Sequence, residues 1–493
     1  MSDEWWRDAV FYEIYVRSFA DSGGDGLGDV TGIRARLPYL RELGVDALWL
    51  TPFYPSPDAD HGYDVADYVD VDPRFGTLAD VDALVAEAHE LGLRVTIDLV
   101  PNHTSDRHRW FAEHPEYYVW TEEPNNWPSH FGGPAWTFDA ARGRHYLHLF
   151  APEQPDLDWH VPAVEDEFDA ILRFWLDRGV DGFRIDVGHV LYKDPELRDE
   201  QEPFPETPFA DWRRAVDRPE LHPLYRRWRA LADSYPGERM FVGEVVLSDP
   251  RRIARYVRPD ELHLCFNFTF LYEEWDADRL RATIDGTLAA LAEVGATSSW
   301  VLENHDVTRL ATRYGSLRAA RAAALLLLAL PGAAFLYAGQ ELGLGEVELP
   351  DEARRDPIFR RTGGERIGRD GCRVPLPWSG DAPPFGFTTG EPWLPQPAGW
   401  SGLTVEAQAG DPASTLELYR AALAARPRGG GLDWRASPPG TLVFERGELL
   451  CLVNVSAPAL DLPEGELVLT SEPGVTNMLP PETAAWLRRP VPS

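Results

Sequence analysis

The feature that most constrains the fold of this sequence is a recurring unit in which an amphipathic helix ends at a glycine and a short apolar strand follows. A helix can begin at Thr77 with apolar residues every three to four positions, and Gly92 ends it before a strand at 94–100. Helices that alternate with short apolar strands are typical of a buried parallel sheet. The expected strands lie at 11–16, 46–50, 94–100, 182–187, 240–245, 263–268, 300–304 and 333–339. Eight such strands predict an α/β fold, the (β/α)8 TIM barrel.

The spacing of these strands predicts an insertion. The third and fourth strands are about twice as far apart as the second and third, and residues 104–168 between them carry many aromatic residues among Pro, Asn and Gly. We expect an irregular subdomain there, over the mouth of the barrel. Residues 350–412 are rich in Pro and Gly and predict a long loop, whereas a helix at about 414–425 and strands at 441–456 and 464–471 predict a small C-terminal all-β domain. The expected domains are the first part of the barrel at 1–103, an inserted subdomain at 104–168, the second part of the barrel at 169–412 and the C-terminal helix and β-domain at 413–493.

Charge and cysteine content exclude several classes of partner. The 47 Lys and Arg residues against 80 Asp and Glu residues give a net charge of −33, which repels nucleic acid and anionic membrane surfaces. Three cysteines without paired spacing indicate no disulfide framework and favour a reducing compartment. The first residues lack the pattern of a secretory signal, and the longest apolar run, 322–330, is too short to cross a bilayer. We therefore expect a cytoplasmic protein that binds neither nucleic acid nor membranes; its oligomeric state stays open.

Carboxylates follow three of the expected barrel strands. Asp186, Glu244 and Asp306 end the fourth, fifth and seventh strands, and the carboxyl ends of barrel strands meet at one face. Like charges that converge in a cleft raise the pKa of one member, which supplies an acid and a base at neutral pH. Arg184 lies two residues before Asp186 on the same strand face, and we expect it to hold Asp186 ionised. An ion pair that closes the barrel top would explain any one of these acids, but the three together suit a retaining glycosidase.

The sequence around these carboxylates resembles glycoside hydrolase family 13, the α-amylase family, and most closely its oligo-1,6-glucosidase and α-glucosidase branch. The resemblance extends from residue 5 to residue 393, about four fifths of the chain. The motifs that carry it are DLVPNHTS (98–105), QPDLDW (154–159), GFRIDV (182–187), GEVV (243–246) and ENHDV (303–307).

The resemblance implies roles for the carboxylates and their surroundings. It makes Asp186 the nucleophile, Glu244 the acid/base, and Asp306 the third carboxylate, which holds sugar hydroxyls as the ring distorts. The residues that it places around the same glucose subsite are His103, Arg184 and His305, with the aromatic residues Phe131 and Phe150 flanking the reacting sugar.

The resemblance also implies a closed end to the pocket. Asp60 and Tyr63 match residues that, in the exo-acting branch, leave room for one terminal glucose. Their partner would be an arginine of the stretch 369–378, with Arg369 as the first choice and Arg373 as the second. A salt bridge across the end of the pocket would make the enzyme cleave from the non-reducing end.

Residues 21–29 resemble the metal loop of the family. A structural Ca²⁺ or Mg²⁺ would be held by Asp21, Asp25 and Asp29 and by the Leu27 carbonyl, although Gly23 stands where a side-chain ligand is usual. No other cofactor is expected, and Gly32 at the position of the closing glutamate excludes an EF-hand.

The leading functional hypothesis is an exo-acting retaining α-glucosidase that acts on short α-glucosides such as maltose and isomaltose. One alternative is a transglucosylase that uses the same intermediate, and another is a non-catalytic barrel that serves as a binding or scaffold protein. Val187 favours α-1,6 specificity in this branch, but Gly188 and His189 depart from the usual continuation, so the linkage stays open. The stretch 309–313 does not reproduce the charged loop of sucrose isomerases, which disfavours isomerisation of sucrose.

Overall fold

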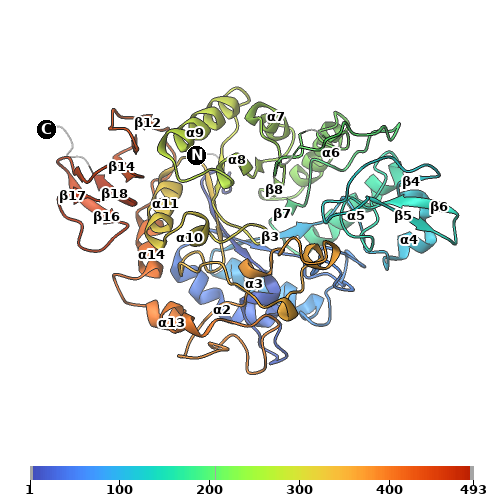
Figure 1. Cartoon of the computed structure of the whole chain (residues 1–493), viewed down its shortest axis with the longest axis horizontal. Coiled ribbons are helices and arrows are strands. Elements are labelled where there is room, and N and C mark those ends of the chain that lie inside the picture. Colours follow the sequence, from blue (N-terminus) through green and yellow to red (C-terminus); the bar gives the residue numbers. More distant parts are fainter. Residues whose placement is uncertain (1–3, 206, 212, 489–493) are drawn as a thin grey trace.

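The computed structural model describes residues 4–205, 207–211 and 213–488. The chain forms an elongated molecule with the barrel in the middle, a small sheet at one end and a C-terminal β-domain at the other (Figure 1). None of the helices in these described ranges combines the length and apolar character needed to cross a membrane.

The central sheet is a nearly closed barrel of eight parallel strands, as predicted. Its strand order is β10-β11-β1-β2-β3-β7-β8-β9. The strands are β1 (Val10–Ile14), β2 (Ala47–Leu50), β3 (Arg94–Leu99), β7 (Gly182–Ile185), β8 (Met240–Gly243), β9 (Leu264–Cys265), β10 (Ser299–Val301) and β11 (Ala333–Tyr337). The two ends of the sheet meet where the Ser299 hydroxyl donates a hydrogen bond to the Cys265 carbonyl, so a side chain joins β10 to β9.

Helices surround this sheet (Figure 1). The longer ones are α2 (Val30–Leu43), α3 (Leu78–Glu90), α5 (Pro162–Asp177), α6 (Leu221–Asp233), α9 (Ala277–Ala292) and α11 (Leu317–Ala329). Helix α3 begins and ends as predicted: Thr77 and Asp80 form a capping box, and Gly92 takes a left-handed conformation (φ +75°) before β3. The short helices are α1 (Val16–Phe19), α4 (Arg109–Glu113), α7 (Pro250–Ala254), α8 (Phe268–Leu271), α10 (Leu310–Arg313), α12 (Pro357–Arg361) and α13 (Val405–Gln408).

The segment at 104–168 is more regular than expected. It contains a three-stranded antiparallel sheet of order β4-β6-β5, from β4 (Trp120–Thr121), β5 (Trp136–Asp139) and β6 (Arg144–Leu147). Its aromatic residues pack mainly on one another, as in the Phe111 and Trp120 rings, whose centroids are 5.8 Å apart. The boundary expected at residue 168 falls inside α5, because this helix already begins at Pro162.

The C-terminal part is all-β after helix α14 (Thr415–Ala425), as predicted. Its five-stranded antiparallel sheet has the order β12-β13-β14-β18-β16. The strands of this part are β12 (Asp433–Trp434), β13 (Thr441–Arg446), β14 (Leu449–Asn454), β15 (Leu460–Asp461), β16 (Glu466–Thr470), β17 (Met478–Leu479) and β18 (Thr483–Arg488). Strand β18 was not predicted, because all but its last residue are buried and it shows no alternation; its Trp486 indole donates to the Leu325 carbonyl of α11 at 3.2 Å.

Candidate active site

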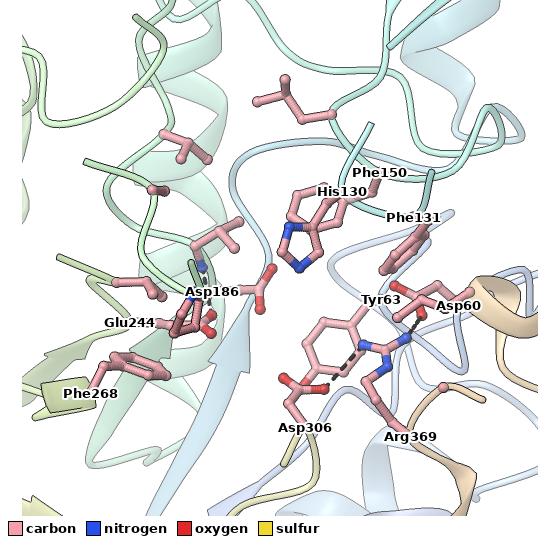
Figure 2. A pocket seen from close by; sticks show the side chains of 18 of the residues that line it. Asp60, Tyr63, His130, Phe131, Phe150, Asp186, Glu244, Phe268, Asp306 and Arg369 are labelled. Atoms are coloured by element: carbon pink, nitrogen blue, oxygen red, sulfur yellow. Dashed lines mark hydrogen bonds and ion pairs between the residues drawn. The ribbon is translucent and has the colours of Figure 1, made fainter. Parts of the chain in front are cut away.

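A cavity of about 690 Å³ opens at the carboxyl ends of the barrel strands. The three carboxylates predicted from the sequence converge on it from separate strand ends: Asp186 follows β7, Glu244 follows β8, and Asp306 lies beyond β10 (Figure 2). The other predicted residues that line it are Asp60, Tyr63, His103, Phe131, Phe150 and Arg369. Three predicted residues lie fully buried beneath its surface and support it from behind: Arg184, His305 and Arg373.

Arg184 is the centre of the site's charge network. Its side chain is 1% exposed, and its guanidinium contacts three carboxylates. Nη1 donates to Asp98 at 2.8 Å and to Asp186 at 2.5 Å, and Nη2 donates to Glu244 at 2.6 Å. The barrel register explains the cluster, because Asp98 on β3 pairs with Arg184 on β7, and Glu244 follows the residue that pairs with Ile185. One cation therefore holds the two carboxylates that the resemblance pairs for catalysis.

The pKa of Asp186 is shifted in the direction opposite to the sequence-based expectation. Burial raises the pKa of Asp186 well above the usual value, Arg184 opposes this shift, and the Glu244 and Asp98 carboxylates add to it. Arg184 alone was expected to keep Asp186 ionised. Its positive charge is shared among three carboxylates, and this divided attraction does not overcome the desolvation of Asp186.

Asp306 has the opposite electrostatic environment. Burial acts to raise its pKa, but the adjacent guanidinium groups of Arg369 and Arg373 outweigh burial and hold the pKa of Asp306 well below the usual range. Nη1 of Arg369 is 3.0 Å from Asp306 Oδ1, and Nη2 of Arg373 is 2.7 Å from the same oxygen. Asp306 is therefore ionised at every pH at which the protein would work.

Arg369, rather than Arg373, is the partner of Asp60. Nη2 of Arg369 lies 2.8 Å from Asp60 Oδ1, whereas the second choice, Arg373, contacts Asp306 and the His305 carbonyl. The guanidinium carbon of Arg369 lies 5.1 Å from the centroid of the Phe131 ring. Asp60, Arg369 and Phe131 therefore form one wall of the pocket (Figure 2). Burial raises the pKa of Asp60 to about 6, against the opposing effect of Arg369.

Both predicted histidines are buried. Burial lowers the pKa of His103 to about 4 and the pKa of His305 well below its usual value, so both rings are neutral at neutral pH. The His305 ring stacks between Tyr15 and Tyr63, with both centroid distances 5.4 Å. Its Nδ1 contacts the Glu13 carboxyl, and its Nε2 lies 2.8 Å from the Tyr63 hydroxyl. These contacts hold the His305 ring in a single orientation.

Several residues of the site were not predicted. His130, Phe268 and Tyr272 line the cavity, and Glu13 supports His305 from β1. The first three lie in loops or helices with no pattern that marks them, and Glu13 lies in a strand that was predicted only as part of the barrel.

Lys193 was also missed, although the sequence does mark it as the only lysine among 47 basic residues. Its buried ammonium donates to Asn102 Oδ1 at 2.5 Å and to the Val190 carbonyl at 2.7 Å, and pairs with Asp156 at 3.0 Å. Those acceptors come from the loop after β3, the loop after β7 and the inserted segment. An ammonium with three N–H donors therefore ties together three segments of the chain near the pocket.

The expected metal loop is closed by hydrogen bonds within the protein. Both carboxylate oxygens of Asp21 accept backbone N–H groups, from Gly23 and Gly24 at 2.7 Å and from Gly26 at 2.8 Å. Asp25 and Asp29 likewise accept backbone N–H groups, and the described part of the chain contains no group of three His, Cys, Asp or Glu residues that could hold a metal ion. Backbone N–H groups therefore use part of the acceptor capacity of these three carboxylates. Binding of Ca²⁺ or Mg²⁺ by Asp21, Asp25, Leu27 and Asp29 stays a prediction.

Comparison with known proteins identifies the family. The family model for the α-amylase catalytic domain matches residues 13–432. A probable α-glucosidase of Rhizobium meliloti (strain 1021) is 42% identical over 498 aligned residues, which cover 92% of this chain and 90% of the relative. An oligo-1,6-glucosidase of Parageobacillus thermoglucosidasius is 36% identical over 85% of this chain and 83% of its own length. The crystal structure of the α-glucosyl transfer enzyme XgtA is similar with a TM-score of 0.89 and 39% identity, over 98% of this chain and 99% of XgtA. The chain therefore belongs to the α-amylase family, glycoside hydrolase family 13, as a glycoside hydrolase of its α-glucosidase branch.

Proposed function

We propose that the protein is an exo-acting, retaining α-glucosidase that releases terminal glucose from the non-reducing end of short α-glucosides such as maltose and isomaltose. The observation that carries the proposal is the position of Asp186 and Glu244 on neighbouring nitrogens of one guanidinium, 2.5 and 2.6 Å away. This sharing favours the short carboxyl separation of retaining glycosidases, about 5–5.5 Å, over the ~6.5–9.5 Å that inverting enzymes need for a water molecule.

The reaction would proceed in two displacements. An Asp186 oxygen attacks the anomeric carbon while the protonated Glu244 gives its proton to the leaving oxygen, so the bond to the aglycone breaks and a glucosyl ester of Asp186 forms. Glu244, now ionised, takes a proton from water, whose oxygen attacks the same carbon and frees Asp186. Two inversions give net retention. Asp306, anionic at all working pH values, accepts hydrogen bonds from sugar hydroxyls as the ring distorts.

The wall formed by Asp60, Arg369 and Phe131 supports the exo-acting mode. The ion pair lies across the pocket from Glu244 (Figure 2). A sugar whose reacting carbon faces Asp186 would have its far hydroxyls against this wall, with no room for a further residue beyond it. The substrate therefore enters with its non-reducing end first.

Transglucosylation is the second candidate, and the 39% identity to an α-glucosyl transfer enzyme favours it. A sugar or alcohol hydroxyl would replace water in the second displacement, with the same residues in the same roles. The two activities are compatible and differ in which acceptor reaches the glucosyl ester.

Replacement of the paired carboxylates tests their roles. Asp186→Asn should lower kcat on maltose by roughly 10⁴-fold or more, because the amide cannot form the ester. Glu244→Gln should lower it by about 10²–10⁴-fold on maltose, but should spare the first turnover of a nitrophenyl α-glucoside, whose leaving group needs no proton. Asp158→Asn, the same change at a half-exposed carboxylate, is the control and should keep normal turnover. Near-normal turnover in a folded Asp186 variant would refute the assignment.

The pH profile tests the electrostatics of Asp186. The nucleophile must be ionised, so activity is lost as pH falls through its pKa, which burial raises well above the ordinary value of about 3.9. Asp306 stays ionised throughout and adds no limb in this range. The acid limb of kcat/KM should therefore lie well above pH 4, where an ordinary aspartate titrates. An acid limb at pH 4 or lower would contradict the raised pKa.

Loss of the wall tests the exo-acting mode. Asp60→Ala should release Arg369 and open the pocket beyond the terminal glucose, with a fall in kcat/KM of about 10²-fold on maltose. With maltotetraose labelled at its reducing end, the natural protein should give labelled maltotriose first, whereas the variant should also give labelled maltose. Asp67→Ala, at an exposed carboxylate of the same segment, is the control. An unchanged product pattern in the Asp60 variant would show that the ion pair does not select the chain end.

A further inference from the structure

Glu13 is a buried carboxyl group that the proposed reaction does not use. It lies on β1 with 1% of its surface exposed, and its carboxyl group contacts Nδ1 of His305. Burial of a charged carboxylate is costly, so a carboxyl group in such a place is either held by a cation or protonated. The hydrogen bonds on the other side of the His305 ring show which of these applies to Glu13.

The contacts of Asp98 fix the orientation of the Tyr63 hydroxyl. Arg184 Nη1 donates to Asp98 at 2.8 Å, and the Trp49 indole donates to it at 3.1 Å. The Tyr63 hydroxyl is a third donor, also at 3.1 Å. Burial raises the pKa of Asp98 to about 6, so the group is ionised at neutral pH and only accepts hydrogen bonds. The single hydroxyl proton of Tyr63 therefore points toward Asp98.

The proton of His305 consequently lies on Nε2. This nitrogen is 2.8 Å from the Tyr63 oxygen, whose own proton is directed elsewhere, so the oxygen can only accept. Burial holds the pKa of His305 well below its usual value, and a neutral imidazole carries one N–H. Because that N–H donates to Tyr63, Nδ1 is left as an acceptor.

An acceptor at Nδ1 requires a donor on Glu13. A carboxyl group donates only when it is protonated, so the contact between Glu13 and Nδ1 is a hydrogen bond from a carboxylic acid to an imidazole. The surroundings agree with this assignment. Burial raises the pKa of Glu13 well above its usual value, Arg184 opposes the shift, and the carboxylates of Asp306 and Asp98 add to it.

The direction of these hydrogen bonds matters for Arg184. Its guanidinium divides one charge among three carboxylates, so its position depends on each partner staying in place. If Nδ1 of His305 carried the proton instead, Nε2 would take the hydroxyl proton of Tyr63, and Asp98 would lose one of its three donors. Tyr63 also lines the pocket, so its hydroxyl would present a different face there (Figure 2).

We propose that Glu13 is a positioning residue of the reaction and that it acts as a neutral carboxylic acid. It donates to His305, which donates to Tyr63, and the Tyr63 hydroxyl donates to the carboxylate that holds Arg184. A chain of hydrogen bonds with one direction thus joins β1 to the charge network of the pocket without adding a charge. This inference rests on the proposed function, because positioning is measured through the reaction at Asp186 and Glu244.

Two substitutions of Glu13 test the role. Glutamine has the shape of the protonated acid and its amide can donate to Nδ1, whereas methionine has a similar length and donates nothing. Glu13→Gln should keep kcat/KM on maltose within threefold of the natural protein. Glu13→Met should lower kcat by roughly 10–100-fold with little change in KM, because small misplacements near reacting atoms cost about this much. Glu90→Gln, at an exposed glutamate of α3, is the control and should change neither constant.

Infrared difference spectroscopy supplies a readout that does not depend on turnover. The spectrum of the natural protein minus that of Glu13→Gln, at neutral pH, should contain the carbonyl band of a protonated carboxylic acid, and this band should shift in D₂O. A residue that only fills space would give no such band. The Glu90→Gln difference spectrum should show carboxylate bands instead.

Three outcomes would overturn the proposal. Carboxylate bands for Glu13, with Glu13→Gln as slow as Glu13→Met, would show a carboxylate paired with an imidazolium. A normal kcat in folded Glu13→Met would show that the chain does not position the site. Either result would leave the proposed function standing, whereas a natural protein that releases no glucose from any α-glucoside would overturn both.

Discussion

The contact of one buried guanidinium with three carboxylates is the interaction on which the rest of the site depends. Arg184 sits between Asp98, Asp186 and Glu244, at 2.5–2.8 Å from each. Removal of one partner of a buried charge pair typically costs about 3–5 kcal/mol, because the remaining charge has no compensation. Without Arg184, three anions would face one another inside the barrel, so this residue supports both the fold of the strand ends and the position of the paired carboxylates.

Arg369 plays the corresponding part on the other side of the pocket. It reaches Asp60, Asp306 and Asp356 from a long loop that follows the barrel strands, at 2.8–3.0 Å. The paired carboxylates Asp186 and Glu244 thus follow barrel strands, whereas a loop remote in sequence supplies the cation that closes the pocket. Rigid strands therefore position the residues proposed to carry out the reaction, and loops determine the shape of the pocket.

The sequence predicted the parts of the site that regular structure determines. Strand ends of a barrel share one face, so Asp186, Glu244 and Asp306 were expected together, and the shared strand face put Arg184 beside Asp186.

Features that depend on the path of a loop were not predictable in the same way. Arg369 and Arg373 are four residues apart, and only the turn between them decides which of the two reaches Asp60. His130 and Tyr272 carry no pattern at all. The net shift of the Asp186 pKa was also missed, because desolvation depends on burial that spacing does not report. Lys193 was missed as well, although its being the only lysine in the sequence could have marked it.

The most direct test of retention is to follow purified protein with maltose and with isomaltose by proton NMR, with attention to the anomeric signals during the first minutes. Asp186 and Glu244 held on one guanidinium predict that the first glucose released is the α-anomer, with the β-anomer appearing only later by mutarotation. Initial release of β-glucose would show that water attacks directly from the opposite face, and would contradict the glucosyl ester on Asp186.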